Sequence, residues 1–168
     1  WATENLFDKK NVLNVSKQAI FSNDMMPFYS YRFIKQRIKN ISNKKILIFG
    51  CAYTGNVGDT RNSPVLDLYK FLKRDNKKIY IHDPYVDYWE EAKLKTINMN
   101  KINTIKPDIL IFATSHDVYK KNNFILKKLN FLSKGKIIID LLGIINDIEY
   151  KKLIKNYSVE ILGKGKNV

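Results

Sequence analysis

Short apolar runs alternate with helical patterns along this chain, and the alternation limits its fold more than any other feature. The clearest runs are Ile-Leu-Ile-Phe at 46–49, Ile-Leu-Ile-Phe at 109–112 and Ile-Ile-Ile at 137–139. Runs without polar positions indicate parallel strands buried on both faces. Helical segments between such strands provide the crossovers of an α/β fold. We therefore expect a Rossmann-like open parallel sheet of about five or six strands, with helices on both faces and a long helix before it.

The leading helix is expected from about Ser16, with a kink or restart at Pro27 and an amphipathic stretch from Met26 to Ile41. A seam near 41–44 divides the chain into a leading region, 1–43, and a sheet domain, 44–168. The other expected elements are strand 45–50, helix 64–74, strand 78–82, helix 87–94, strand 95–99, helix 100–106, strand 108–114, helix 117–132, strand 136–140, helix 147–156 and strand 159–162.

Composition excludes several classes of protein. The single cysteine, Cys51, rules out an internal disulfide and a Cys-rich zinc site, and the two histidines argue against a His-based metal cluster. No apolar run reaches the roughly 20 residues of a membrane span. The first residues lack the pattern of a signal peptide, so we expect a cytoplasmic protein without a membrane partner.

The net charge of +14 suggests at first a polyanionic partner. However, arginine, which forms the forked contacts typical of nucleic-acid recognition, occurs at only four positions. The lysines are scattered along the chain, together with abundant Asn and Ile, as expected from an A/T-rich coding sequence. We predict a solvated basic surface and no nucleic-acid partner, while phosphate-bearing small molecules remain compatible with the charge.

The loop after the first strand, residues 50–64, is the place to look for a ligand site, because ligands of such sheets bind at the carboxyl ends of the strands. Its glycines, at 50, 55 and 58, match neither Gly-x-Gly-x-x-Gly nor a Walker loop. Two interpretations stay open. The glycines could let a phosphate approach the backbone at a helix N-terminus, or they could serve only a tight connector.

The same loop resembles a known family. Gly50-x-Ala-Tyr, followed by Asp59-Thr-Arg61-x-Ser63-Pro64, is similar to the signature of the C-terminal domain of the UDP-glucose/GDP-mannose dehydrogenase family. The resemblance extends over about residues 16–165. The other matching elements are Asn23-Asp-Met-Met-Pro27, Asp83-Pro84-Tyr85-Val86, Thr114-Ser-His116, Asp140 and the closing Ile-Leu-Gly-Lys-Gly.

The resemblance implies a C-terminal portion of an NAD-dependent nucleotide-sugar 6-dehydrogenase, of the UDP-glucose or UDP-N-acetylhexosamine type. Such enzymes oxidise the C6 alcohol of the sugar to a carboxylate for polysaccharide biosynthesis. NAD would bind a domain that this sequence lacks, the catalytic Cys motif is also missing, and the fragment alone should be inactive. Region 1–43 would be the end of the central helical region and form a homodimer. The helix residues implied in that contact are Asn23, Met26, Tyr31 and Ile34.

By the same resemblance, 44–168 binds the UDP part of a UDP-sugar. The implied nucleotide-sugar-binding residues are Tyr53, Thr54, Gly55, Asn56 and Arg61, and the residues that shape the loop are Asp59 and Ser63. Two positions depart from the family. Thr54 stands where a Lys is usual, and Leu142 lies where many members have an Arg. These departures keep an alternative open, a non-catalytic nucleotide-binding or interaction module that kept the fold.

Structural roles are expected for the other polar residues of this region. We predict that Asp59 and Arg61 form an ion pair and that Ser63 caps the following helix. Cys51 is expected to be a small buried residue and His82 to be structural. For His116 we favour a hydrogen bond that stabilises a loop, and for Asp83 a role in a turn.

Overall fold

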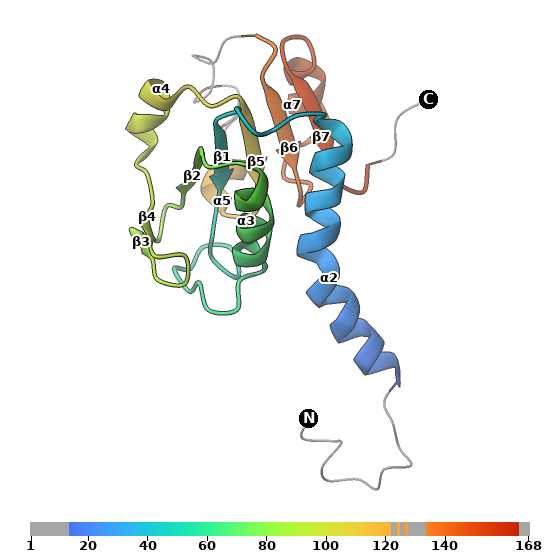
Figure 1. Cartoon of the computed structure of the whole chain (residues 1–168). Coiled ribbons are helices and arrows are strands. Elements are labelled where there is room, and N and C mark those ends of the chain that lie inside the picture. Colours follow the sequence, from blue (N-terminus) through green and yellow to red (C-terminus); the bar gives the residue numbers. More distant parts are fainter. Residues whose placement is uncertain (1–13, 122–123, 125–126, 128–133, 165–168) are drawn as a thin grey trace, which may run out of the picture.

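The computed structural model describes residues 14–121, 124, 127 and 134–164, and shows a sheet flanked by helices with one long helix projecting from it (Figure 1). The elements are α2 (Asn14–Arg37), β1 (Ile46–Phe49), α3 (Pro64–Asp75), β2 (Ile79–His82), β3 (Tyr88–Trp89), β4 (Leu94–Lys95), the 3-10 helix η1 (Met99–Lys101), α4 (Ile102–Ile105), β5 (Ile109–Phe112), α5 (Asp117–Lys120), β6 (Ile137–Asp140), α7 (Asp147–Leu153) and β7 (Ser158–Ile161).

Within the described residues, the main sheet has five parallel strands in the order β2-β1-β5-β6-β7. The predicted open parallel sheet is therefore confirmed. Strand β1 has β2 on one side and β5 on the other, so the order of the strands reverses between β1 and β5. This reversal is a topological switch point, and the loops that leave β1 and β5 meet at its carboxyl edge.

The two faces of the sheet bury separate clusters, because successive side chains of a strand point to opposite sides. Ile46 and Ile48 of β1 pack in a cluster with residues of α2 and α3. Leu47 and Phe49 pack in the other cluster, with residues of α4, α5 and α7. All four positions of β1 are fully buried, which explains why this strand has no polar position.

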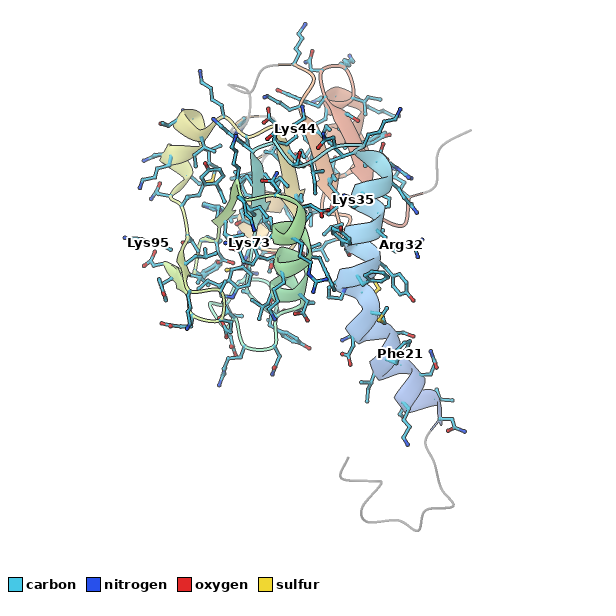
Figure 2. The ribbon with its side chains drawn as sticks, in the orientation of Figure 1. Phe21, Arg32, Lys35, Lys44, Lys73 and Lys95 are labelled. Carbon is cyan, nitrogen blue, oxygen red and sulfur yellow. The ribbon has the colours of Figure 1, made fainter. Side chains whose placement is uncertain are left out.

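Helix α2 differs from the expectation at two points. Of the kink or restart predicted at Pro27, the restart is not found, because the helix continues through Pro27, and the helix ends at Arg37 instead of Ile41. Pro27 has no N–H to donate to the carbonyl of Asn23, and the residue is buried. Residues 14–24 are exposed and extend away from the sheet domain, as the position of Phe21 shows (Figure 2).

The predicted helix 87–94 and strand 95–99 are wrong. The segment forms a small antiparallel hairpin in which β3 pairs with β4, and Lys93 takes the left-handed conformation in its turn. Trp89 is fully buried and its ring lies 5.7 Å from that of Tyr69. Burial of this indole holds the segment extended and overrides its local helical pattern.

Of the helix expected at 117–132, the structure shows helix α5 over Asp117–Lys120. Most of the remaining predicted length lies outside the described residues. The weak helix expected at 100–106 is present as η1 and α4, ended by Lys106 in the left-handed conformation. In the described part of the chain, no helix is long and apolar enough to cross a membrane.

Candidate functional site

The β1–α3 loop, residues 50–63, lies at the carboxyl edge of the sheet next to the switch point. Gly50 has φ +90°, and a Cβ there would lie 2.3 Å from the Cβ of Thr114 in the loop after β5. The Thr114 hydroxyl donates a hydrogen bond to the carbonyl of Ala52 at 3.0 Å. Gly50 is therefore needed because two loops approach closely at the switch point.

Gly55 and Gly58 also face neighbouring loops. A Cβ on Gly55 would lie 2.4 Å from the carbonyl oxygen of Ser115, and one on Gly58 would lie 2.6 Å from that of Tyr85. Both glycines thus allow the β1–α3 loop to pack on the backbone that follows β5 and β2. Of the two interpretations of this glycine pattern, the geometry favours the tight connector over a phosphate cradle.

Asp83 is the residue that joins these loops. Its carboxylate accepts backbone hydrogen bonds from Cys51 at 2.8 Å, Ala52 at 3.2 Å and Tyr85 at 2.9 Å, and lies 3.1 Å from Nε2 of His116. Burial would raise the pKa of this carboxyl, but the hydrogen bonds from His116 and the backbone outweigh it, so the pKa is lowered. The predicted role of Asp83 in a turn is confirmed. Its buried carboxylate also holds together three segments, namely the β1–α3 loop and the loops after β2 and β5.

His116 connects the same network to the middle of the β1–α3 loop. Its Nδ1 accepts a hydrogen bond from the backbone N–H of Asn56 at 2.9 Å. Asn56 has φ 65°, and its side-chain oxygen accepts from the N–H of Asp117 at 2.9 Å. The predicted loop-stabilising role of His116 is confirmed.

Two further residues of this region are structural, as expected. Nδ1 of His82 lies 2.9 Å from the hydroxyl of Tyr119, and burial lowers the pKa of His82 to about 4. Cys51 is fully buried, and burial raises the pKa of its thiol. A thiol in this setting is a packing residue and not a nucleophile.

A cavity of about 620 Å³ opens between the β1–α3 loop, helix α3 and helix α2. Tyr53 and Thr54 line it, and Tyr53 is 59% exposed. Ser63, which also lines it, accepts a hydrogen bond from the N–H of Val65 as the N-cap of α3. The other described residues that line the cavity are Asn23, Asp24, Pro27, Asn62, Pro64, Leu66, Asp67, Lys70 and Glu91.

The other residues predicted to bind the nucleotide sugar are not among the described residues that line this cavity. Gly55 and Asn56 are turned to the loop after β5, as described above. Arg61 is exposed and forms the predicted ion pair with Asp59, in which its guanidinium donates two hydrogen bonds of 2.9 and 2.7 Å. Those bonds lower the pKa of Asp59 to about 2.

Carboxylates outnumber cations in the described lining of the cavity, although the whole chain is basic. Lys70 forms an ion pair with Asp67 at 3.0 Å, and Glu91 accepts a hydrogen bond from the hydroxyl of Thr60 at 2.7 Å. Asp24 adds a third carboxylate. The described residues of this chain therefore neutralise little of the charge of any anion that enters the cavity.

The residues predicted for a dimer helix have different surroundings from those expected. Ile34 is fully buried in the core of its own domain, and the Tyr31 hydroxyl donates to Asp75 of α3 at 2.7 Å. Asn23 lines the cavity, and of the three apolar or aromatic candidates Met26 is the exposed one, at 46%. Tyr31 and Ile34 pack within the chain, and the dimer contact itself stays a prediction.

Leu142 lies next to a smaller apolar cavity of about 110 Å³ that is also bordered by Met26, Leu68 and Leu141. Its side chain is 48% exposed. The position at which the resemblance implies an Arg thus has apolar surroundings. Sequence reasoning missed Lys70, Glu91 and Asp24 as neighbours of Tyr53, because only the packing of α2 and of the β3–β4 hairpin on α3 brings them together.

Comparison with known proteins identifies the relatives of this chain. Residues 47–147 match the model of the UDP-glucose/GDP-mannose dehydrogenase family, UDP binding domain. The UDP-N-acetyl-D-mannosamine dehydrogenase of Methanococcus aeolicus is 33% identical over 156 residues, which are 90% of this chain and 34% of the relative. UDP-glucose 6-dehydrogenase 3 of Arabidopsis thaliana is 35% identical over 92 residues, 54% of this chain and 19% of the relative.

Solved structures show the same similarity. The UDP-D-ManNAc dehydrogenase of Pyrococcus horikoshii matches with a TM-score of 0.58 at 28% identity, over 74% of this chain and 29% of that chain. An NDP-N-acetyl-D-galactosaminuronic acid dehydrogenase of Methanosarcina mazei matches in fold with a TM-score of 0.68 at 20% identity, over 84% and 30%. These curated dehydrogenases match the chain over most of its own length. The chain, however, spans only about a third of their length. It belongs to the UDP-glucose/GDP-mannose dehydrogenase family, and residues 47–147 correspond to the UDP binding domain of that family.

Proposed function

We propose that this chain binds the UDP part of a UDP-sugar in the cavity beside Tyr53 and Thr54. In this proposal it is the C-terminal portion of an NAD-dependent UDP-sugar 6-dehydrogenase, which oxidises the C6 alcohol to a carboxylate. The observation that carries the proposal is the cavity of about 620 Å³ at the carboxyl edge of β1, in a domain of this family. Relatives named UDP-N-acetyl-D-mannosamine dehydrogenase support an N-acetylhexosamine as the sugar.

Tyr53 and Thr54 would make different contacts with the nucleotide. The exposed ring of Tyr53 offers an aromatic face on which a uracil base can stack. The hydroxyl of Thr54 can donate a hydrogen bond to a phosphate oxygen, but it cannot neutralise phosphate charge as a Lys at that position would. Because Lys70 already pairs with Asp67, we expect weak binding of UDP by the chain alone.

The described residues do not fit NAD. In a dinucleotide fold an acidic residue after the second strand binds the ribose, whereas the Asp83 carboxylate is fully buried and occupied by three backbone N–H groups and His116. The glycines of the β1–α3 loop face neighbouring loops and not an open phosphate site. The relatives are longer than this chain, and most of their length has no counterpart in it. We therefore assign NAD and the catalytic residues to that other part of the parent enzyme.

For the leading region, residues 1–43, we propose a contact with a second copy of the chain, and for 44–168 the UDP-binding domain. The exposed apolar residues on the projecting half of α2, Val15, Ile20 and Phe21, support such a contact more than Tyr31 or Ile34 do. The cellular setting that we propose is the cytoplasm, in polysaccharide biosynthesis.

Titration of the chain with UDP, followed by backbone amide shifts in NMR spectra, tests the binding site. We expect shifts at Tyr53, Thr54 and Lys70. Tyr53→Ala should abolish them, whereas Tyr88→Ala, which removes a similarly exposed ring from the β3–β4 hairpin, should leave them unchanged. Shifts confined to another edge of the sheet would place the nucleotide elsewhere and refute the proposal.

A further inference from the structure

His116 is a buried titratable side chain whose proton position is fixed by its two partners. The N–H of Asn56 donates to Nδ1, so Nδ1 carries no hydrogen. The neutral ring therefore holds its hydrogen on Nε2, which donates to the Asp83 carboxylate at 3.1 Å. Both side chains have no exposed surface, so water does not compete for these two hydrogen bonds.

The segment with Tyr53 and Thr54 lies between two anchors of this network. On one side, the N–H groups of Cys51 and Ala52 donate to Asp83. On the other side, Asn56 donates to His116, which in turn donates to the same carboxylate. The orientation of the two residues at the cavity thus depends on both anchors.

We infer that His116 is a positioning residue for the nucleotide and that it acts through the acceptor at Nδ1. That acceptor holds Asn56, and through it Tyr53 and Thr54, at the edge of the cavity. Without an acceptor at this place the Asn56 hydrogen bond is lost, even where a donor still reaches Asp83, and the ligand segment loses one anchor. This inference rests on the proposed binding of UDP at Tyr53 and Thr54.

His116 has further aromatic and titratable neighbours besides Asp83 and Asn56. The rings of Tyr85 and Tyr119 lie 5.2 and 5.4 Å away. The remaining titratable neighbours are His82, which interacts with the charge of His116, Cys51 beside Asp83, and Asp117, which is paired with Lys120.

Two variants separate the anchors. In His116→Asn the amide oxygen can take the place of Nδ1 and accept from Asn56, and the side chain no longer titrates. In His116→Gln the amide nitrogen can reach the place of Nε2 and donate to Asp83, but Asn56 is left without its acceptor. We expect UDP affinity near wild type for His116→Asn and about tenfold weaker for His116→Gln, the size typical of one buried N–H without a partner.

The affinity for UDP is measured for the wild type and both variants at the same neutral pH. Equal affinities of the Asn and Gln variants, or a loss of affinity in His116→Asn as large as in His116→Gln, would overturn the inference.

Spectra of the chain without ligand separate this inference from the proposed function. Imidazole nitrogen shifts should show the hydrogen on Nε2, and the Asn56 amide shift should change in His116→Gln more than in His116→Asn. If these results are found but UDP does not bind, the proposed site is refuted and the anchor is retained. If the Asn56 amide has the same shift in the wild type and in His116→Gln, the anchor is refuted even where UDP binds.

Discussion

Tyr31 on α2 donates its hydroxyl hydrogen to the carboxylate of Asp75 at the end of α3, with an O–O distance of 2.7 Å. The same carboxylate oxygen lies 2.7 Å from Nζ of Lys35, one turn further along α2. These bonds lower the pKa of Asp75. They join the leading helix to the sheet domain across 44 and 40 positions of sequence, so the second half of α2 is a structural part of that domain.

Loss of this contact should destabilise the chain measurably. We expect Asp75→Asn to lower the free energy of unfolding by about 1 kcal/mol, because a charged acceptor shared by two donors is replaced by a neutral one. Urea unfolding measures the change. Asp67→Asn is the matched control, since its exposed pair with Lys70 is expected to contribute at most about 0.5 kcal/mol. Equal effects of the two variants would contradict the role assigned to Asp75.

The close approach of the two loops at the switch point predicts a difference between two glycine substitutions. Gly50 and Gly143 both have positive φ, so alanine is strained at each. A Cβ on Gly143 meets nothing within 4 Å, whereas one on Gly50 overlaps Thr114. Gly50→Ala should therefore be more destabilising than Gly143→Ala by about 1–3 kcal/mol in thermal unfolding, the usual effect of overpacking. A smaller effect at Gly50 would mean that the loops are not so close.

Adding a cation beside the cavity should strengthen binding of UDP. Thr54→Lys places a charged donor at a position that lines the cavity, and a charge-assisted hydrogen bond contributes about 1.5–3 kcal/mol. We expect at least about tenfold tighter binding by calorimetry. Thr104→Lys, on the exposed surface of α4, adds the same charge away from the cavity and controls for general attraction. Similar gains in both variants would show that the loop is not the phosphate site.

Sequence alone predicted the sheet, because strands buried on both faces leave an unbroken apolar run. Ile46–Phe49 and Ile109–Phe112 are such runs, and both are fully buried. The β3–β4 hairpin escaped prediction because two-residue strands carry no period. Its extended form depends on the burial of Trp89 against Tyr69, a contact between residues 20 positions apart.

The residues of the candidate site were predicted better than their partners. The loop and the Ser63 cap follow from the strand, glycines and capping pattern, whereas Tyr53 and Thr54 were chosen by the family resemblance, and these three residues do line the cavity. The positions of Asp24 and Glu91 depend on how α2 and the hairpin pack on α3, which no local pattern contains. The contacts of Asn56 with His116 and Asp117 likewise depend on the meeting of the β1 and β5 loops.

His82 predicts that stability decreases in acid. Its pKa is lowered to about 4 in the folded chain, mainly by burial, whereas an unfolded histidine titrates near 6.5. Above about pH 6.5 the ring is neutral in both states and stability does not depend on it. As the pH falls from there to about 4, the unfolded chain binds a proton that the folded chain does not, so the free energy of unfolding falls by at most about 1.4 kcal/mol per pH unit. His82→Asn, which keeps a polar partner for Tyr119 but does not titrate, should flatten the profile in urea unfolding between these pH values. An unchanged slope in that variant would assign the acid sensitivity to another group.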